Sequence, residues 1–217
     1  MAHRRQSKFP SCRSWIREAF IQWGLFTWRG LHSISNRRYC PVCQRGEWFS
    51  PPTTRVCLPR SPFGIIDLFI FQRGIDVIAE IDTPGHTSVI SKTFPEHIAC
   101  PEAAPWASYA NEPPAGQLRI ASPDTVKFTT DLLVNAAKLF PGNYFSTGGD
   151  EINAKCYTDD PQTQAALATS GKTFEQALDA FTQAEHTALK GAGKTAVVWQ
   201  EMVLDHQVTL ANNTIIM

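Results

Sequence analysis

The sequence of 217 residues predicts an α/β fold built on a parallel sheet. Short apolar segments typical of buried strands alternate with segments in which apolar residues recur at helical spacing. This alternation begins at residue 72 and continues to the end of the sequence. Alternating strands and helices imply parallel strands joined by right-handed crossovers. A doubly wound sheet and a (β/α)8 barrel both satisfy that order.

The first strand is expected over residues 75–81, which are apolar and β-branched, as a buried parallel strand should be. Pro84 and Gly85 end it, and the prolines that follow predict a long loop. The next strands are expected over residues 144–147 and 195–199. Residues 214–217 are predicted to begin a fourth strand.

Two helices are expected between these strands. The first begins with Ser122 as N-cap and Pro123 in the first helical position, and Pro141-Gly142 ends it. The second begins at Thr173 and ends near Gly191 and Gly193. Apolar residues at helical spacing define the buried faces: Val126, Thr129, Leu133, Ala136 and Phe140 on the first helix, and Phe174, Leu178, Phe181 and Ala188 on the second.

The composition divides the chain into two unlike segments. The hydrophobic share of 43% and the charged share of 18% are typical of a globular protein rather than a disordered one. The formal charge of zero is an average, because residues 1–71 carry 11 basic and 3 acidic side chains and residues 72–217 carry 9 and 17. No apolar run approaches the ~20 residues that a membrane-spanning helix needs. We therefore expect no membrane span.

Residues 1–71 are rich in Arg, Cys and Trp and show no sustained period. Cys40 and Cys43 have the spacing of a zinc knuckle, but no second close pair accompanies them. The Arg-rich start also allows a transit peptide, and basic residues among tryptophans allow nucleic-acid binding, although no nucleic-acid motif is present. We favour a segment without a fold of its own, either disordered or an artefact of the gene model. No secretory signal is recognised in it.

Candidate functional residues gather at the ends of the predicted strands. Asp82 and His86 follow the first, Asp150 and Glu151 follow the second, and Trp199 and Glu201 follow the third. Because the carboxyl ends of parallel strands meet at one edge of a sheet, we expect a single site there.

Asp150 and Glu151 can face one ligand only where the strand ends and the backbone bends, because neighbours in a strand point to opposite faces. Gly148 and Gly149 permit that bend. Two carboxyl groups in different surroundings can supply one acid and one base. The alternative is that Asp150 caps a following helix and Glu151 faces water. Trp199 is either a core residue or a wall on which a sugar ring stacks.

Residues 72–217 contain three distinctive segments: Glu-Ile-Asp-Thr-Pro-Gly-His (80–86), Gly-Gly-Asp-Glu (148–151) and Trp-Gln-Glu (199–201). Together they resemble glycoside hydrolase family 20, the β-N-acetylhexosaminidases, and their sequence is most similar to the fungal type. The resemblance implies a (β/α)8 TIM barrel, no metal and no cofactor. It also implies a retaining mechanism in which the substrate's own acetamido group is the nucleophile. The implied partners are oligosaccharides or glycoconjugates that end in N-acetylhexosamine.

The resemblance also implies roles for the site residues. Glu151 would be the general acid, and Asp150 would hold the 2-acetamido group. His86, supported by Asp82, would lie near the acid and help to set its pKa. Trp199 would form part of the pocket around the acetyl methyl group, with Glu201 in a supporting position.

Further features suit a secreted or vesicular parent protein. Cys100 and Cys156 match positions where the family often carries a disulfide, and disulfides persist in oxidising compartments. Asn212-Asn213-Thr214 is an N-glycosylation sequon. A homodimer of the full-length parent is also compatible with the resemblance.

The chain departs from the family pattern in two ways. Ser146-Thr147 stands where many members have a histidine, and the strands correspond by order to about the third to sixth of the barrel. A whole barrel takes roughly 250 residues. We therefore expect a partial barrel over residues 72–217. The alternative to an active hydrolase is a truncated, inactive fragment or a weak sugar-binding remnant.

Overall fold

The computed structural model describes residues 74–217. The predictions for residues 1–71, including the zinc knuckle at Cys40 and Cys43, lie outside the described residues. The strands of the described part are β1 (Ala79–Glu80), β2 (Ile98–Ala99), β3 (Gln117–Leu118), β4 (Tyr144–Gly148), β5 (Thr195–Val198) and β6 (Ile215–Ile216). The α-helices are α3 (Pro123–Ala137), α4 (Ala154–Asp159), α5 (Pro161–Ser170), α6 (Phe174–Gly191) and α7 (Glu201–Leu204), and the 3₁₀ helices are η2 (Ser88–Lys92), η3 (Pro95–His97) and η4 (Trp106–Ser108).

The main sheet is parallel and has the order β1-β4-β5-β6. Phe145 of β4 lies between Ala79 of β1 and Ala196 of β5. Each new strand is added on the same side as the chain proceeds, whereas a doubly wound sheet reverses its order partway. The order agrees with the predicted partial barrel, which is not closed in the part of the chain that the structure describes.

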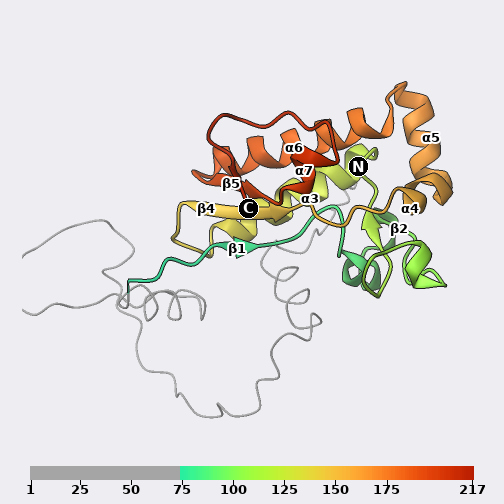
Figure 1. Ribbon diagram of the computed structural model, residues 1–217, viewed down its shortest axis with the longest axis horizontal. Helices are drawn as coiled ribbons and strands as arrows, with labels where there is room; N and C mark the ends of the chain where they lie inside the picture. Colours follow the sequence, from blue (N-terminus) through green and yellow to red (C-terminus); the bar gives the residue numbers. More distant parts are fainter. Residues whose placement is uncertain (1–73) are drawn as a thin grey trace, which may run out of the picture. The chain divides into compact units, whose positions relative to one another are not determined.

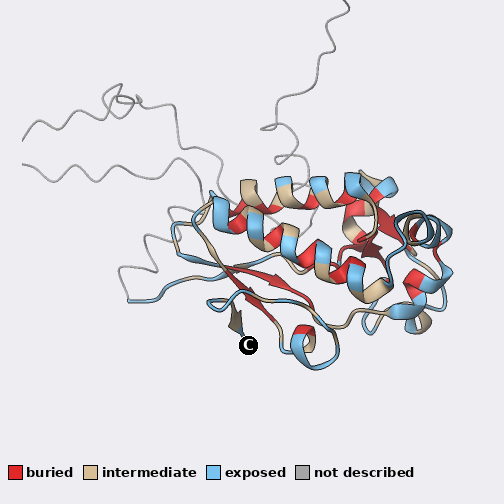
Figure 2. Cartoon of the chain, turned by 90° about the horizontal axis from the view of Figure 1, so that it is seen from above, coloured by how far each residue is buried: buried red, intermediate tan, exposed pale blue. Residues whose placement is uncertain are grey.

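Helices α3 and α6 lie side by side on one face of this sheet (Figure 1). Their buried stripes face the sheet and their exposed stripes face outward (Figure 2). Between the helices and the sheet lies a core of Leu133, Ala136, Ala137, Phe145, Leu189 and Ala196. None of the helices within residues 74–217 is long and apolar enough to cross a membrane.

Both predicted helices begin where the sequence placed their first residues. The Ser122 side chain accepts a hydrogen bond from the Thr125 amide at the start of α3. Thr173 and Gln176 form a capping box at the start of α6, in which each side chain accepts from the other residue's amide. The predicted cap of α3 was therefore correct, and α6 begins where the sequence placed its start, with a capping box that was not predicted.

The first predicted strand is shorter and more exposed than expected. Only Ala79 and Glu80 pair as β1, and the side chains of Ile75 and Ile78 are 56% and 44% exposed. Within residues 74–217, β1 pairs with β4 alone, so its outer edge has no neighbouring strand. The apolar sequence predicted a strand that is buried in the sheet, and such burial needs a second neighbouring strand beside β1.

The predicted long loop after the first strand contains regular structure. We call residues 84–121 the β2–β3 excursion, since β2 and β3 form an antiparallel pair within it. His97 anchors the excursion on α3: its ring stacks on Phe128 at a centroid distance of 4.4 Å, and Nδ1 lies 3.1 Å from Thr125 Oγ1. The prolines marked turns correctly but gave no signal for the strand pair.

Helices α4 and α5, which the sequence did not predict, are attached to this excursion. Arg119 forms two hydrogen bonds with Asp160, at 3.0 Å and 2.9 Å. Asp160 also caps α5 by accepting from the Thr163 amide. A disulfide joins Cys100 to Cys156, with their Cα atoms 5.8 Å apart. These contacts fix α4 and α5 beside the β2–β3 excursion (Figure 1).

Replacing Arg119 by Met should destabilise the fold strongly. The Asp160 side chain is 6% exposed, and a buried carboxylate that loses its partner typically costs about 3–5 kcal/mol. Burial tends to raise the pKa of Asp160, but the hydrogen bonds from Arg119 and Thr163 outweigh it and hold the pKa below its ordinary value.

Asp160 therefore stabilises the fold above the unfolded carboxyl pKa of about 3.9, and this stability is lost as the pH falls through the folded pKa. Urea unfolding should give a lower free energy of unfolding for Arg119→Met than for wild type. This difference should narrow below about pH 4. Lys127→Met, which breaks an exposed pair with Asp131, is the control and should change stability little. Equal effects of the two substitutions would contradict the assignment.

Candidate active site

The ends of three neighbouring strands meet at one edge of the main sheet. Backbone pairing continues past the strands themselves, because the Thr83 amide donates to the Thr147 carbonyl and the Trp199 amide donates to the Gly148 carbonyl. Asp82, the pair Asp150–Glu151, and Trp199 are thus held at adjacent strand ends, as the sequence predicted.

Gly148 and Gly149 form the bend that turns Asp150 and Glu151 toward this edge. Both have positive φ angles, +68° and +103°. A Cβ atom at Gly148 would lie 1.9 Å from Asp82 Oδ1, and one at Gly149 would lie 2.5 Å from the Met202 side chain. Glu151 itself adopts φ of 53°, which is strained for a residue with a side chain. The two glycines are required by space as well as by conformation.

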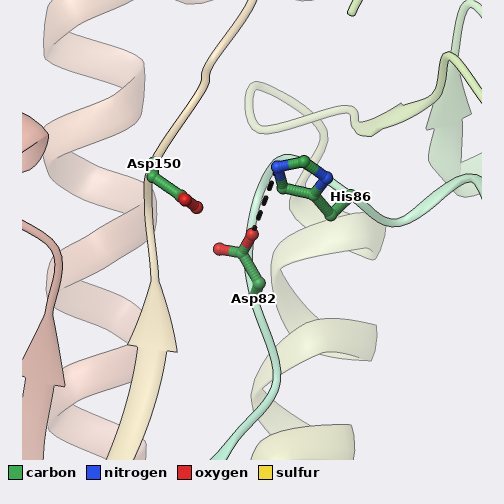
Figure 3. Close-up of side chains that lie close together, drawn as sticks. All are labelled: Asp82, His86 and Asp150. Atoms are coloured by element: carbon green, nitrogen blue, oxygen red, sulfur yellow. Dashed lines mark ion pairs between the residues drawn. The ribbon is translucent and has the colours of Figure 1, made fainter. Parts of the chain in front are cut away.

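Asp82 lies at the centre of the site. Its Oδ1 accepts a hydrogen bond of 2.8 Å from the Gly149 amide. Burial is the main reason that the pKa of Asp82 rises to about 8, and the hydrogen bond and charge of Asp150 add to it, against the Gly149 hydrogen bond. Figure 3 shows the Asp150 carboxylate turned toward Asp82. At neutral pH Asp82 therefore carries a proton that it can donate to Asp150.

His86 lies between Asp82 and Glu151. Its Nε2 is 3.7 Å from Asp82 Oδ2 and 3.3 Å from Glu151 Oε2. The side chains of His86 and Glu151 are each 34% exposed, so a ligand can reach both. Within the described residues, Asp150 Oδ1 is a buried atom without a hydrogen-bond partner. This oxygen is free to bind a polar group of a ligand, whereas Glu151 Oε2 is buried beside His86 Nε2.

One ligand atom each from Asp82, His86 and Asp150 lies within 4.8 Å of the other two, which is close enough for metal coordination. Proton sharing between the two carboxyl groups explains the same proximity without a metal, since like charges this close cannot both ionise readily. We assign no metal role to them.

Gln117 is a supporting residue that the sequence analysis missed. Its buried side-chain amide donates to the Asn153 carbonyl and accepts from the Asn153 amide, both at 2.9 Å. The Asn153 side chain caps α4. Asp150 is therefore not the cap of the following helix, and the alternative interpretation of that residue was wrong. Gln117 holds the backbone two residues after Glu151, and no pattern in the sequence pointed to it.

Two titratable residues of α6, Glu185 and His186, contact the strand ends from the helix-covered face of the sheet. Thr83 Oγ1 is 2.8 Å from Glu185 Oε1, and Thr147 Oγ1 is 3.3 Å from His186 Nε2. Burial lowers the pKa of His186 to about 4, so this imidazole is neutral at pH 7. The sequence analysis missed both. Glu185 had a usable signal, because it is an acid on the apolar face shared by Leu178 and Leu189.

Ser146, at the predicted departure from the family pattern, connects two strands. Its hydroxyl donates to Glu80 Oε2 at 2.6 Å and accepts from the Gly148 amide at 3.2 Å. The face of the sheet away from α3 and α6 thus carries a polar contact just before the bend.

The remaining candidates occupy different surroundings. Trp199 is half-buried directly after β5, and Glu201 is half-buried as the first residue of α7. Within residues 74–217, no hydrogen bond or ion pair joins the Glu201 side chain to the other site residues. Asn212 is exposed in a turn before β6. A cavity of about 440 Å³ lies elsewhere, between α3 and α6, lined by residues that include Val126, Lys127 and Phe181.

Comparison with known proteins agrees with these motifs. A family model described as "Glycosyl hydrolase family 20, catalytic domain" matches residues 66–217. A beta-hexosaminidase of Arthroderma benhamiae is 34% identical over 154 residues, which cover 68% of this chain and 24% of that protein. The beta-hexosaminidase subunit alpha of Bos taurus is 31% identical over 149 residues, covering 66% of this chain and 27% of that protein.

Solved structures show the same likeness. A chitobiase of Flavobacterium johnsoniae superimposes with a TM-score of 0.57 at 29% identity, covering 70% of this chain and 22% of that one. An exo-β-N-acetylglucosaminidase of Vibrio harveyi, in complex with N-acetylglucosamine, has a TM-score of 0.57 at 26% identity, covering 71% of this chain and 24% of that one. The chain spans about a quarter of the length of these relatives.

The proton on Asp82 should make stability depend on pH in a way that Asp82→Asn removes. A carboxyl with a folded pKa of about 8 and an unfolded pKa of about 3.9 binds more protons in the folded state. Stability should therefore fall as the pH rises between these values, by up to about 1.4 kcal/mol per pH unit.

Urea unfolding at several pH values between 5 and 8 checks this. Asparagine keeps the hydrogen bond from Gly149, so Asp82→Asn should gain stability over wild type as the pH rises. The exposed control Asp131→Asn should run parallel to wild type. If the free energy of unfolding changed with pH in the same way in all three proteins, the assignment of a proton to Asp82 would be wrong.

Proposed function

Because the chain belongs to glycoside hydrolase family 20, we propose that it hydrolyses terminal N-acetylhexosamine residues by a retaining, substrate-assisted mechanism. The observation that carries the proposal is the placement of Glu151 beside Asp150 with His86 Nε2 3.3 Å from Glu151 Oε2. A protonatable carboxyl and a second carboxyl thus face one accessible edge of the sheet. The chain spans about a quarter of the length of its relatives, so the activity of the whole relatives comes to this chain only as a proposal.

The names of the relatives support the substrate class. The curated relatives are beta-hexosaminidases, and one structural neighbour is a chitobiase. We propose as substrates oligosaccharides or glycoconjugates that end in N-acetylhexosamine, with fragments of chitin among them. The homodimer of the full-length parent stays a prediction.

In the first step, Glu151 would donate its proton to the glycosidic oxygen while the bond from that oxygen to the anomeric carbon breaks. The acetamido oxygen of the substrate attacks the same carbon and forms an oxazolinium ion, so no enzyme carboxylate acts as nucleophile. Asp150 has a buried oxygen without a partner in the described residues. This oxygen would accept from the acetamido N–H and orient the group for attack.

In the second step, Glu151 would act as the base that removes a proton from the incoming water. The oxazolinium ring then opens and returns the acetamido group, with retention at the anomeric carbon. His86 would stabilise the carboxylate form of Glu151 from 3.3 Å away and would be held in place by Asp82. Asp82 would donate a hydrogen bond toward Asp150.

Trp199 would form a wall of the sugar site. Its backbone is fixed beside Gly148 by a 3.0 Å hydrogen bond, and its side chain is half-buried. An indole ring in that position can pack against a methyl group or a sugar face. Glu201, without a polar contact to the other site residues in the described part, would serve as a supporting residue.

Glu151→Gln should lower hydrolysis by about 10²-fold or more, because glutamine cannot donate the proton. The assay uses the purified 217-residue chain and two N-acetylglucosaminides, one with a good aryl leaving group and one with a sugar leaving group. The loss of rate should be larger for the substrate with the sugar leaving group, because this leaving group depends more on protonation than the aryl group does.

The matched control is Asp131→Asn, which converts an exposed carboxyl on α3 to an amide and should keep wild-type rates. An aryl glucoside without the acetamido group should not be cleaved, since it lacks the nucleophile. Wild-type rates in Glu151→Gln would contradict the assigned acid. A chain that binds N-acetylglucosamine without cleaving either substrate would instead fit the alternative of a sugar-binding remnant.

We propose further that the protein passes through an oxidising, glycosylating compartment and is secreted or vesicular. The disulfide between Cys100 and Cys156 and the exposed position of Asn212 support this. Neither feature depends on the catalytic proposal.

Expressed in the secretory pathway of a eukaryotic host, the chain should acquire one N-linked glycan at Asn212. Asn212→Gln should remove the glycan, and the neighbouring Asn213→Gln, which keeps the sequon intact, should retain it. The measurement is electrophoretic mobility before and after endoglycosidase treatment. A wild-type chain whose mobility the enzyme leaves unchanged would count against the compartment.

A further inference from the structure

Glu185 is a buried acid that the mechanism above does not use. It lies on the inner face of α6 and is 2% exposed. Its neighbours on that face include Leu178, Phe181 and Leu189, which are also buried. In the described part of the chain no lysine, arginine or histidine forms an ion pair with it. An ionised carboxylate in such surroundings would lose its hydration without compensation.

The hydrogen-bond geometry points to the neutral acid. Thr83 Oγ1 lies 2.8 Å from Glu185 Oε1 and 3.0 Å from the Thr147 carbonyl oxygen. A threonine hydroxyl has one proton, so it cannot donate fully to both acceptors. If Glu185 carries a proton, it donates to Thr83, and the Thr83 hydroxyl donates to Thr147. Each group in this chain then has a partner.

The titratable groups that face Glu185 from other elements supply no cation that would stabilise its carboxylate form. Asp82 at the end of β1 and Tyr157 on α4 interact with it electrostatically, and neither can become a cation. His186, next to it on α6, is uncharged at neutral pH. Burial is the main cause that raises the pKa of Glu185 well above its ordinary value, and Asp82 adds to it against the Thr83 hydrogen bond.

This hydrogen-bond chain connects α6 to the two strand ends of the site. Thr83 directly follows Asp82, and its amide donates to the Thr147 carbonyl at 2.9 Å. Thr147 directly precedes the glycine bend, whose second amide donates to Asp82. A shift of Thr83 relative to Thr147 would therefore change how Asp82 meets Asp150 and His86.

We propose that Glu185 is a positioning residue for this site and that it acts as a neutral carboxylic acid, through Thr83, on the strand ends that carry Asp82 and Asp150. The positioning role rests on the proposed function. The protonation state does not, so the two parts are tested separately.

The first experiment measures the protonation state without any activity. Urea unfolding of the full 217-residue chain is compared with Glu185→Gln between pH 5 and 8. Glutamine can donate to Thr83 as the neutral acid does. In wild type the folded state keeps a proton that the unfolded glutamic acid, with a pKa of about 4.3, has lost. The unfolding equilibrium constant of wild type should therefore rise relative to Glu185→Gln by up to about tenfold per pH unit.

Asp131→Asn, which removes an exposed carboxyl, is the matched control and should show a constant ratio to wild type. A constant ratio for Glu185→Gln as well would overturn the neutral acid. If Glu185→Gln does not fold, the carboxyl carbon resonance of Glu185 in the wild-type chain decides the question. A resonance typical of a carboxylate at pH 7 would overturn the proposal.

The second experiment tests the positioning role with Glu185→Leu, which removes the hydrogen bond, and Glu185→Gln, which keeps it. Rates of N-acetylglucosaminide hydrolysis are corrected for the folded fraction. Misplacement of site groups by about 1 Å can cost up to about 10²-fold. Glu185→Leu should lower kcat by about tenfold or more, with a smaller change in KM, and Glu185→Gln should recover most of that loss.

Equal corrected kcat values for wild type and Glu185→Leu would overturn the positioning role. A pH profile that shifts in Glu185→Leu but not in Glu185→Gln would support it, because the Asp82–Asp150 pair would then titrate differently. If wild type hydrolyses nothing, the proposed function fails, while the unfolding experiment still decides the state of Glu185.

Discussion

The close approach of Asp82 to the backbone of Gly148 and Gly149 is the contact on which the candidate site depends. Asp82 occupies the space that a side chain at Gly148 would need, with its oxygen 1.9 Å from the ideal Cβ position. The same oxygen accepts from the Gly149 amide at 2.8 Å. This contact joins the end of β1 to the bend after β4. It sets Asp150 and Glu151 on the same edge as His86.

Two parts of the structure support that contact from different sides. The β2–β3 excursion holds the chain after Glu151 through the Gln117–Asn153 hydrogen bonds, and the disulfide and the Arg119–Asp160 pair attach α4 and α5 to it. Helix α6 supports the strand ends from behind through Glu185 and Thr83. The strained backbone of Glu151 is thus fixed by neighbours that are far from it in the sequence.

The electrostatics of the site follow from burial rather than from ion pairing. Asp82 and Glu185 are raised in pKa chiefly because water is excluded from them, and His186 is lowered for the same reason. The buried groups at the strand ends are therefore neutral at pH 7.

The sequence by itself determined the parallel α/β class, both long helices with the cap of the first, and the set of side chains at the strand ends, because periodicity, capping and strand-end position are local patterns. The tertiary structure decided that the order β1-β4-β5-β6 is that of a partial barrel, since strand order depends on pairing between distant segments. It also decided the short β1, whose apolar residues 75–78 predicted burial that an edge strand does not provide. Gln117, Thr83 and Glu185 acquire their roles only from contacts across 36 and 102 residues of sequence. No local pattern encodes such contacts, because they arise from the packing of the excursion and of α6 against the same edge of the sheet.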